Sequence, residues 1–221
     1  MRKGSLLFDG YQVRRQKMVA NLEQMGITDN TVLSAMLEVP RHLFVEEAFR
    51  SRAYDQAALP IGMGQTISQP YIVARMTELL LKSASTPIER VLEVGTGCGY
   101  QTAVLQKVGI QEIYSIERLA SLREIAKRNL RAANLFHARL ICSDGSLGLP
   151  TAAPFDAILL TAAAKEVPVP LLNQLKLNGR MVLPLEQGNE QYLWVIDKYI
   201  DGYQETCIQA VKFVLLLSGR Q

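Results

Sequence analysis

Apolar positions along this chain follow two different patterns. In the first 86 residues they recur every three or four positions, which is the period of a helix with one buried face. The pattern predicts a helix that ends at Gly26, a second over residues 31–38, and a third that starts at Ser68-Gln69-Pro70. Between the second and third helices, residues 54–67 are irregular and glycine-rich, and an ordered connection of this length is often functional.

From residue 89 onward, short apolar runs alternate with amphipathic stretches. Strands are predicted near residues 90–94, 112–116, 139–142, 156–160 and 180–184, and helices near 100–108, 119–133 and 168–175. This alternation is typical of an α/β fold with a doubly wound, mostly parallel sheet. Apolar runs at 191–197 and 208–217 predict a closing C-terminal antiparallel strand pair. We expect residues 1–86 to form an N-terminal helical extension and loop packed on the same domain, with the α/β unit spanning 87–221.

The first predicted strand runs directly into Gly95-Thr96-Gly97-Cys98-Gly99, and a helical pattern begins at Tyr100. A strand, a glycine turn and a helix N-terminus together can bind the polar part of a nucleotide-like cofactor, although any tight turn between strand and helix can need glycines. A dinucleotide site would have its third glycine at position 100, so Tyr100 disfavours an NAD-dependent oxidoreductase. Glycines at 95, 97 and 99, with Glu93 two residues earlier, are typical of S-adenosylmethionine (SAM) methyltransferases.

Ligands of open α/β sheets bind beyond the carboxyl ends of the strands. Glu117 ends the second predicted strand, where it can accept hydrogen bonds from ribose hydroxyls. Asp144, followed by Gly145, can accept a hydrogen bond from an adenine amino group, but an Asp-Gly turn explains it equally well. Thr161 follows the fourth strand and either admits the ligand closely or packs against the core. Ser68 precedes a helical proline and, taken alone, is best explained as a helix cap.

Composition narrows the class of protein. The chain has 221 residues, 48% of them hydrophobic, 20% charged, and a net charge of +3. This balance fits a globular domain and gives no reason to expect a nucleic-acid partner. No apolar run approaches the ~18 residues of a membrane span, and the N-terminal apolar stretch is too short for a signal peptide. Three separated cysteines and two histidines indicate neither a disulfide framework nor a metal site. We expect a cytoplasmic protein without a metal.

Several segments resemble the protein-L-isoaspartate O-methyltransferase family. They lie at residues 39–45, 53–55, 92–100, 154–158 and 179–184, and above all at 58–70, which contains the specific string Gly-Gln-Thr-Ile-Ser-Gln-Pro. The resemblance covers nearly the whole chain. It implies a class I SAM methyltransferase fold of Rossmann-like type, SAM as cofactor, and isoaspartyl-containing proteins and peptides as partners. The reaction it implies is methylation of the free α-carboxylate of an isoaspartyl residue, which initiates repair.

The same resemblance assigns roles to individual residues. Ser68 is the expected catalytic residue, and the substrate is expected to contact Leu59, Pro60, Ile61, Gly62, Val214 and Leu215. The expected cofactor-binding residues are Gln65, Thr66, Ile67, Ser68, Glu93, Gly95, Gly97, Gly99, Glu117, Asp144, Gly145 and Thr161. The chain departs from the family at Ser143, where glycine is common, and at Leu215, where proline is usual.

Two other functions stay open at this point. The chain could methylate a different, dedicated peptide or small-molecule carboxylate, an alternative that Leu215 favours. It could also be an inactive SAM-binding module, against which the intact glycine turn, Glu117 and Ser68 argue. We expect a monomer.

Overall fold

The computed structural model describes residues 10–82 and 88–221. Two predictions therefore lie outside the described residues. One is that the N-terminal apolar stretch is not a signal peptide, and the other is the boundary between residues 86 and 87. The three predicted N-terminal helices are present as α1 (Gln12–Gln24), α2 (Asn30–Glu38) and α3 (Pro70–Leu81). Asp29 caps α2, because its carboxylate accepts hydrogen bonds from the amides of Thr31 and Val32 at 2.8 and 3.1 Å.

Seven strands form one sheet in the order β5-β4-β3-β6-β7-β8-β9. The parallel strands are β3 (Arg90–Val94), β4 (Glu112–Glu117), β5 (Arg139–Cys142), β6 (Phe155–Leu160) and β7 (Leu175–Gln187). Strands β8 (Glu190–Tyr199) and β9 (Gly202–Val211) pair antiparallel at one edge. The predicted doubly wound, mostly parallel sheet is confirmed. Strand order reverses at β3, so the glycine turn that follows it lies where such folds bind ligands.

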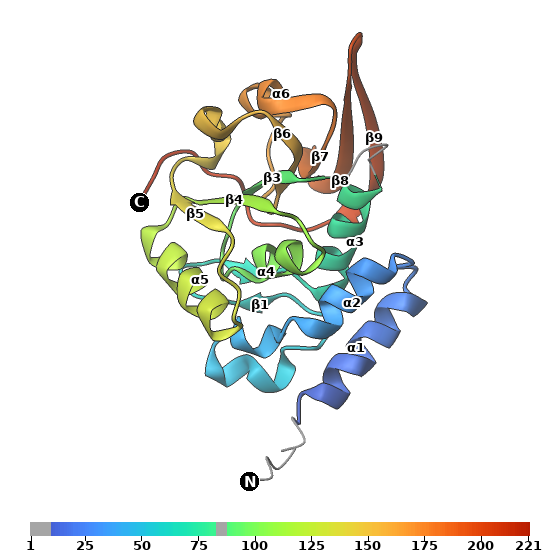
Figure 1. Ribbon diagram of the computed structural model, residues 1–221, viewed down its shortest axis with the longest axis vertical. Helices are drawn as coiled ribbons and strands as arrows, with labels where there is room; N and C mark the ends of the chain where they lie inside the picture. The colour runs from blue at the N-terminus through green and yellow to red at the C-terminus, as the bar shows by residue number, and fades with distance from the viewer. Residues whose placement is uncertain (1–9, 83–87) are drawn as a thin grey trace.

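Helices cover both faces of this sheet, as Figure 1 shows. Alternate strand residues point to opposite sides: Val91 packs in the cluster that contains α3 and α4 (Tyr100–Lys107), and Leu92 packs in the cluster that contains α6 (Val169–Gln174). A third cluster joins α1 and α2 to α4 and to α5 (Ala120–Ala132). The N-terminal helices therefore share a core with the α/β unit. No helix in the described residues is long and apolar enough to cross a membrane.

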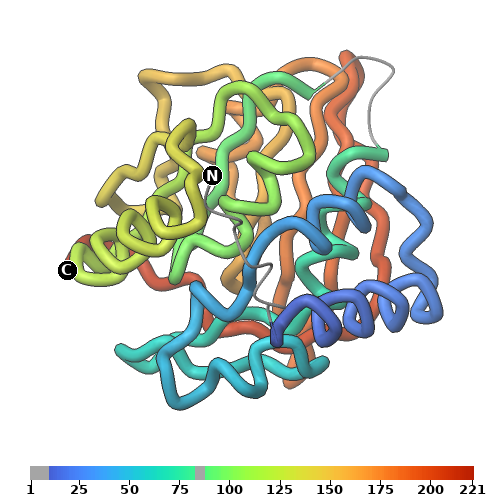
Figure 2. The backbone as a smooth tube through the Cα atoms, turned by 60° about the horizontal axis from the view of Figure 1, so that its bottom comes forward, coloured from blue at the N-terminus to red at the C-terminus, as the bar shows by residue number. Residues whose placement is uncertain are grey.

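The C-terminal end differs from the prediction. The apolar run 208–217 was expected to be the last strand, but β9 starts at Gly202 and ends at Val211. A tight hairpin explains the shift, since Tyr199 pairs with Gly202 and fixes the register of the whole pair. Residues 212–221 leave the sheet, and Figures 1 and 2 show this red segment crossing the molecule to end beside α5. The Ala120 amide donates to the Gln221 carbonyl at 2.9 Å there.

The glycine-rich segment 54–67 is ordered. It contains a small hairpin of β1 (Leu59–Pro60) and β2 (Thr66–Ile67), whose turn holds Gly62, Met63 and Gly64 all at positive φ. Short 3₁₀ turns precede it, η1 (Arg41–Leu43) and η2 (Glu47–Arg52), and two more, η3 (Gly145–Leu147) and η4 (Pro150–Ala152), follow β5.

The capping interpretation of Ser68 is wrong. Gln69 occupies the N-cap position of α3, and no side chain caps that end. Because Pro70 has no amide hydrogen and a fixed φ, the helix begins at that residue, and Ser68 lies two residues before it. Its side chain is therefore not used by the helix.

Candidate active site

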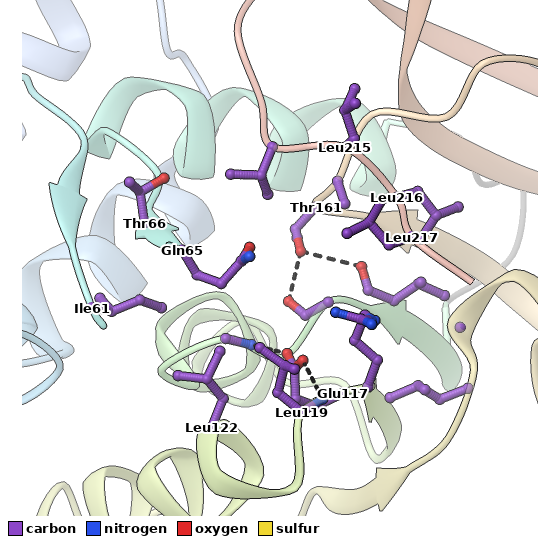
Figure 3. A pocket seen from close by; sticks show the side chains of 18 residues that line it. Ile61, Gln65, Thr66, Glu117, Leu119, Leu122, Thr161, Leu215, Leu216 and Leu217 are labelled. Atoms are coloured by element: carbon purple, nitrogen blue, oxygen red, sulfur yellow. Dashed lines mark hydrogen bonds between the residues drawn. The ribbon is translucent and has the colours of Figure 1, made fainter. Parts of the chain in front are cut away.

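A cavity opens beyond the carboxyl ends of the parallel strands, beside the glycine turn. We call it the inner cavity. The empty space within it, which is continuous with solvent, is about 620 Å³. Figure 3 shows the hairpin residues on one side and the C-terminal segment on the other. The lining residues are Ile61, Gln65, Thr66, Val94, Gly95, Gly97, Ile116, Glu117, Arg118, Leu119, Leu122, Gly145, Thr161, Ala162, Val214, Leu215, Leu216 and Leu217.

The glycine turn lets the backbone approach a ligand closely. Gly95 has φ of +101°, and a Cβ atom there would lie 2.3 Å from Oγ1 of Thr161. That hydroxyl donates to the Gly95 carbonyl at 2.6 Å, so Thr161 fixes the turn as well as lining the cavity. Gly99 does not line the cavity; it precedes α4 at φ of +88°, against Ala126 of α5. Its role is close packing of two helices.

Glu117 is the acidic residue of the cavity wall and is 6% exposed. One carboxylate oxygen accepts from the Gly97 amide at 2.9 Å and the other from the Leu119 amide at 3.0 Å. Both bonds appear as dashed lines in Figure 3. A carboxylate has about four lone-pair positions, so roughly two stay available to a ligand. Glu117 is thus held rigidly with acceptor capacity to spare.

Glu93 lies beneath the glycine turn and is not among the residues that line the cavity. Its side chain is fully buried, and one oxygen accepts from Thr102 at 2.5 Å and from Ser115 at 2.7 Å. The other oxygen has no hydrogen-bond partner. Burial raises the pKa of Glu93 to about 7, against the opposing effect of the two hydroxyls. Its position supports the turn from below, through Ser115 and the Ser115–Thr96 hydroxyl contact of 2.6 Å.

Asp144 also lies outside the cavity lining, whereas Gly145 lines it. One Asp144 oxygen accepts from the amide and hydroxyl of Ser146, as a cap of η3, and the other accepts from the Gly219 amide at 2.6 Å. These contacts hold the Asp-Gly turn and the C-terminal segment together, and they hold the pKa of Asp144 below its usual range despite partial burial. The geometry favours the turn interpretation over an adenine contact.

A second depression, which we call the outer cleft, adjoins the inner cavity. Thr66, Thr161 and Val214 line both, so the two spaces meet at these side chains. The outer cleft is otherwise lined by residues at the start of α3, at and after the end of β9, after α1 and before β1. These residues are Met25, Ala58, Ser68, Gln69, Tyr71, Ile72, Gln209, Ala210, Val211, Lys212 and Phe213. A smaller space between them is lined by Ile67 and Ser68 together with the glycine turn.

Ser68 does not line the inner cavity; it lines the outer cleft and the smaller space, beside the junction of the two spaces at Thr66 and Thr161. Within the described residues its hydroxyl makes no hydrogen bond, whereas its carbonyl accepts one from Arg41 at 2.6 Å. A hydroxyl left free by the protein beside such a junction can orient a ligand oxygen.

The predicted substrate residues are only partly brought together. Val214 lines both spaces, but Ile61 and Leu215 line the inner cavity rather than the outer cleft. Leu59 is buried, and neither Pro60 nor Gly62 lines either space. Sequence reasoning missed residues 209–213, because the last strand was placed too far along the chain, and it also missed Tyr71 at the start of α3. It also missed Arg118 and Leu119, although their position directly after Glu117 could have indicated them.

Comparison with known proteins shows the family to which this chain belongs. The family model described as Protein-L-isoaspartate(D-aspartate) O-methyltransferase (PCMT) matches residues 13–221. The chain belongs to this family. A protein-L-isoaspartate O-methyltransferase of Chromobacterium violaceum is 60% identical over 93% of this chain and 91% of its own length. One of Dechloromonas aromatica is 53% identical over 95% and 96%.

Solved structures agree with the fold. A Plasmodium falciparum PCMT in complex with S-adenosyl-L-homocysteine has a TM-score of 0.80 and 26% identity, over 92% of this chain and 98% of that one. Another protein-L-isoaspartate O-methyltransferase has a TM-score of 0.81 and 28% identity, over 91% and 65%. The chain is thus a SAM-dependent methyltransferase of class I fold.

The inner cavity fits this cofactor. Gly95 and Gly97 give the cavity a wall without side chains, and Glu117 offers acceptors suited to ribose hydroxyls. The walls formed by Ile116, Leu119 and Leu122 are apolar, as a flat adenine ring requires. No group of three or more potential metal ligands occurs among the described residues.

Proposed function

We propose that this enzyme methylates the free α-carboxylate of L-isoaspartyl residues in damaged proteins and peptides, and so initiates their repair. The observation that carries the proposal is that the two spaces meet at Thr66, Thr161 and Val214, with Ser68 lining the outer cleft and the smaller space beside them. The family's reaction needs a cofactor and a peptide carboxylate that meet at one point. The inner cavity suits the first and the outer cleft, bordered by the end of β9, suits the second.

On the cofactor side, we assign Glu117 to the ribose hydroxyls, with Gly95 and Gly97 providing the close backbone surface. Gln65, Thr66, Ile67, Gly145 and Thr161 complete the site. Glu93 and Gly99 act indirectly, by supporting the turn and packing its helix, and Asp144 acts through the Gly145 turn. When bound, SAM supplies an electrophilic methyl group on a sulfonium, which passes to a carboxylate oxygen and leaves a neutral thioether.

On the acceptor side, the chain positions a nucleophile that is already charged. A free carboxylate has an ordinary pKa near 4 and is ionised at neutral pH, so no general base is needed. In the described residues no histidine lines either space. The Ser68 hydroxyl donates one hydrogen bond to the carboxylate and orients it without the charge neutralisation of an ion pair. Positioning of this kind can contribute roughly 7–11 kcal/mol.

Selectivity for isoaspartate follows from the same geometry. In an isoaspartyl residue the main chain continues through the side-chain carbon, so the free carboxylate lies nearer the backbone than in aspartate. A cleft that fixes the backbone brings only one of these carboxylates to the junction, and a displacement of about 1 Å costs on the order of a hundredfold in rate.

The deciding experiment supplies labelled SAM and two peptides that differ only in aspartate or isoaspartate. We expect at least about a hundredfold higher kcat/KM for the isoaspartyl peptide, a gap of roughly 2.7 kcal/mol. Equal rates on the two peptides, or methylation of a small carboxylate alone, would show that another acceptor is used. SAM binding without transfer to any of them would indicate an inactive module. We also propose a cytoplasmic monomer, which fractionation and light scattering test directly.

A further inference from the structure

Arg41 is the most deeply buried cation of the described chain. Its exposed fraction is 0%, and it lies in η1, outside both the inner cavity and the outer cleft. No carboxylate pairs with it in the described residues. A buried charge normally needs a partner, because removing it from water costs several kcal/mol. The compensation must therefore come from other groups.

Two backbone carbonyls and one aromatic ring provide it. The guanidinium donates from Nε to the Ala53 carbonyl at 2.7 Å and from Nη2 to the Ser68 carbonyl at 2.6 Å. It lies 4.6 Å from the centre of the Tyr100 ring, a cation–π geometry. Burial lowers the pKa of Arg41, and the neighbouring Tyr100 acts in the opposite direction. Nη1 makes no hydrogen bond of standard geometry.

The two carbonyls have a particular place in the chain. Ala53 immediately precedes the segment 54–67, and Ser68 immediately follows it. One planar group thus bonds to both ends of the segment that carries the β1–β2 hairpin. This segment supplies Ile61, Gln65 and Thr66 to the inner cavity and Ala58 to the outer cleft. We propose that Arg41 is a positioning residue that clamps both ends of the active-site segment and so fixes Ser68 and the hairpin for methyl transfer.

Stability alone does not account for such a residue. Replacement of buried charged groups by well-packed apolar side chains of similar volume is often neutral or stabilising. A lysine in its place has a single nitrogen and cannot match the planar fork that reaches two carbonyls. The clamp therefore requires the planar guanidinium group of an arginine. It rests on the proposed function only in that the segment must lie beside the reacting groups.

The test uses Arg41→Lys and Arg41→Met in the full chain, with Arg180→Met as the matched control. Arg180 is a partly buried arginine that bonds to Asp197 and to the Leu79 carbonyl at the far end of α3, away from both spaces. Steady-state kinetics with an isoaspartyl peptide and SAM, calorimetric SAM binding, thermal unfolding and hydrogen exchange are measured on each folded variant.

We expect both Arg41 variants to lose at least about tenfold in kcat/KM for the peptide, since small misplacements of positioned groups are costly. Amide hydrogen exchange should become faster selectively in residues 54–69. The fold-change in SAM affinity should be smaller than the fold-change in kcat/KM for the peptide. Arg180→Met should lose comparable thermal stability and keep its turnover and its protection in 54–69.

Three results would overturn the clamp. Arg41→Lys could match the wild-type kcat/KM, which would remove the requirement for a fork. The Arg41 and Arg180 variants could lose activity equally at equal stability loss, which would reduce Arg41 to a general structural residue. Failure of both Arg41 variants to fold would do the same. Ser68→Ala separates this proposal from the role of Ser68, because it keeps the carbonyl to which Arg41 donates: normal turnover in that variant refutes the hydroxyl's role and leaves the exchange result to decide the clamp.

Discussion

The assignment of Glu117 to the ribose is open to a sharp test, Glu117→Ala. The wild-type carboxylate accepts hydrogen bonds from the amides of Gly97 and Leu119, at 2.9 and 3.0 Å. About two of its acceptor positions remain for ribose hydroxyls. A hydrogen bond to a charged group contributes roughly 1.5–3 kcal/mol, and part of that returns when water replaces the carboxylate. We therefore expect SAM affinity to fall by about 1–3 kcal/mol, or roughly 5- to 150-fold in Kd.

Isothermal titration calorimetry with SAM measures the change. Glu124→Gln is the control, because Glu124 is an exposed carboxylate on α5 that pairs with Arg123 and lines neither space. Loss of the two amide contacts could also weaken binding indirectly. A ligand that lacks one ribose hydroxyl distinguishes this indirect effect from loss of a direct bond to the ribose. If Glu117 binds that hydroxyl directly, the two losses are not additive, because they remove the same bond. Unchanged affinity in folded Glu117→Ala would falsify the assignment.

Three further outcomes follow from the same site. Ser68→Ala should cut turnover at least about tenfold, roughly 1.4 kcal/mol, with little change in melting temperature, since Ser68 does not cap α3; a normal rate in steady-state assays contradicts this. Gly95→Ala should weaken SAM binding at least about tenfold, because the new Cβ would lie 2.3 Å from a threonine hydroxyl, whereas Gly109→Ala, at a similar φ of +95° with open space around it, should bind normally. Glu93 is more easily ionised in the unfolded chain, so its favourable contribution is complete below its ordinary pKa of 4.5 and is lost as pH rises through about 7. Glu93→Gln removes this loss. The free energy of unfolding of the variant, measured with denaturant, should therefore rise relative to that of the wild type by about 2–3 kcal/mol as the pH goes from 5 to 8. A difference between the two proteins that does not change with pH would refute the raised pKa.

The sequence by itself determined the sheet and the glycine turn. Strand β3 and helix α4 could be predicted because buried parallel strands are continuous apolar runs and a positive φ at a tight turn favours glycine. Position directly after a strand was enough to place Glu117 and Thr161 at the cavity. Each of these inferences depends on a pattern of residues that are close in sequence. Such a pattern is present in the chain whether or not tertiary contacts have formed.

Only the tertiary structure decided the rest, because those features depend on residues distant in sequence. The hairpin register moved the last strand to Gly202–Val211 and sent residues 212–217 over the site. The proposed role of Arg41 depends on two carbonyls that are 12 and 27 positions away in the chain. Ser68 had the sequence of a cap, but the helix begins at Pro70 with Gln69 as its N-cap, which leaves the Ser68 hydroxyl free beside the outer cleft. Local propensity placed most elements to within a few residues, with the last strand as the main exception, whereas burial and long-range hydrogen bonds selected which side chains face the site.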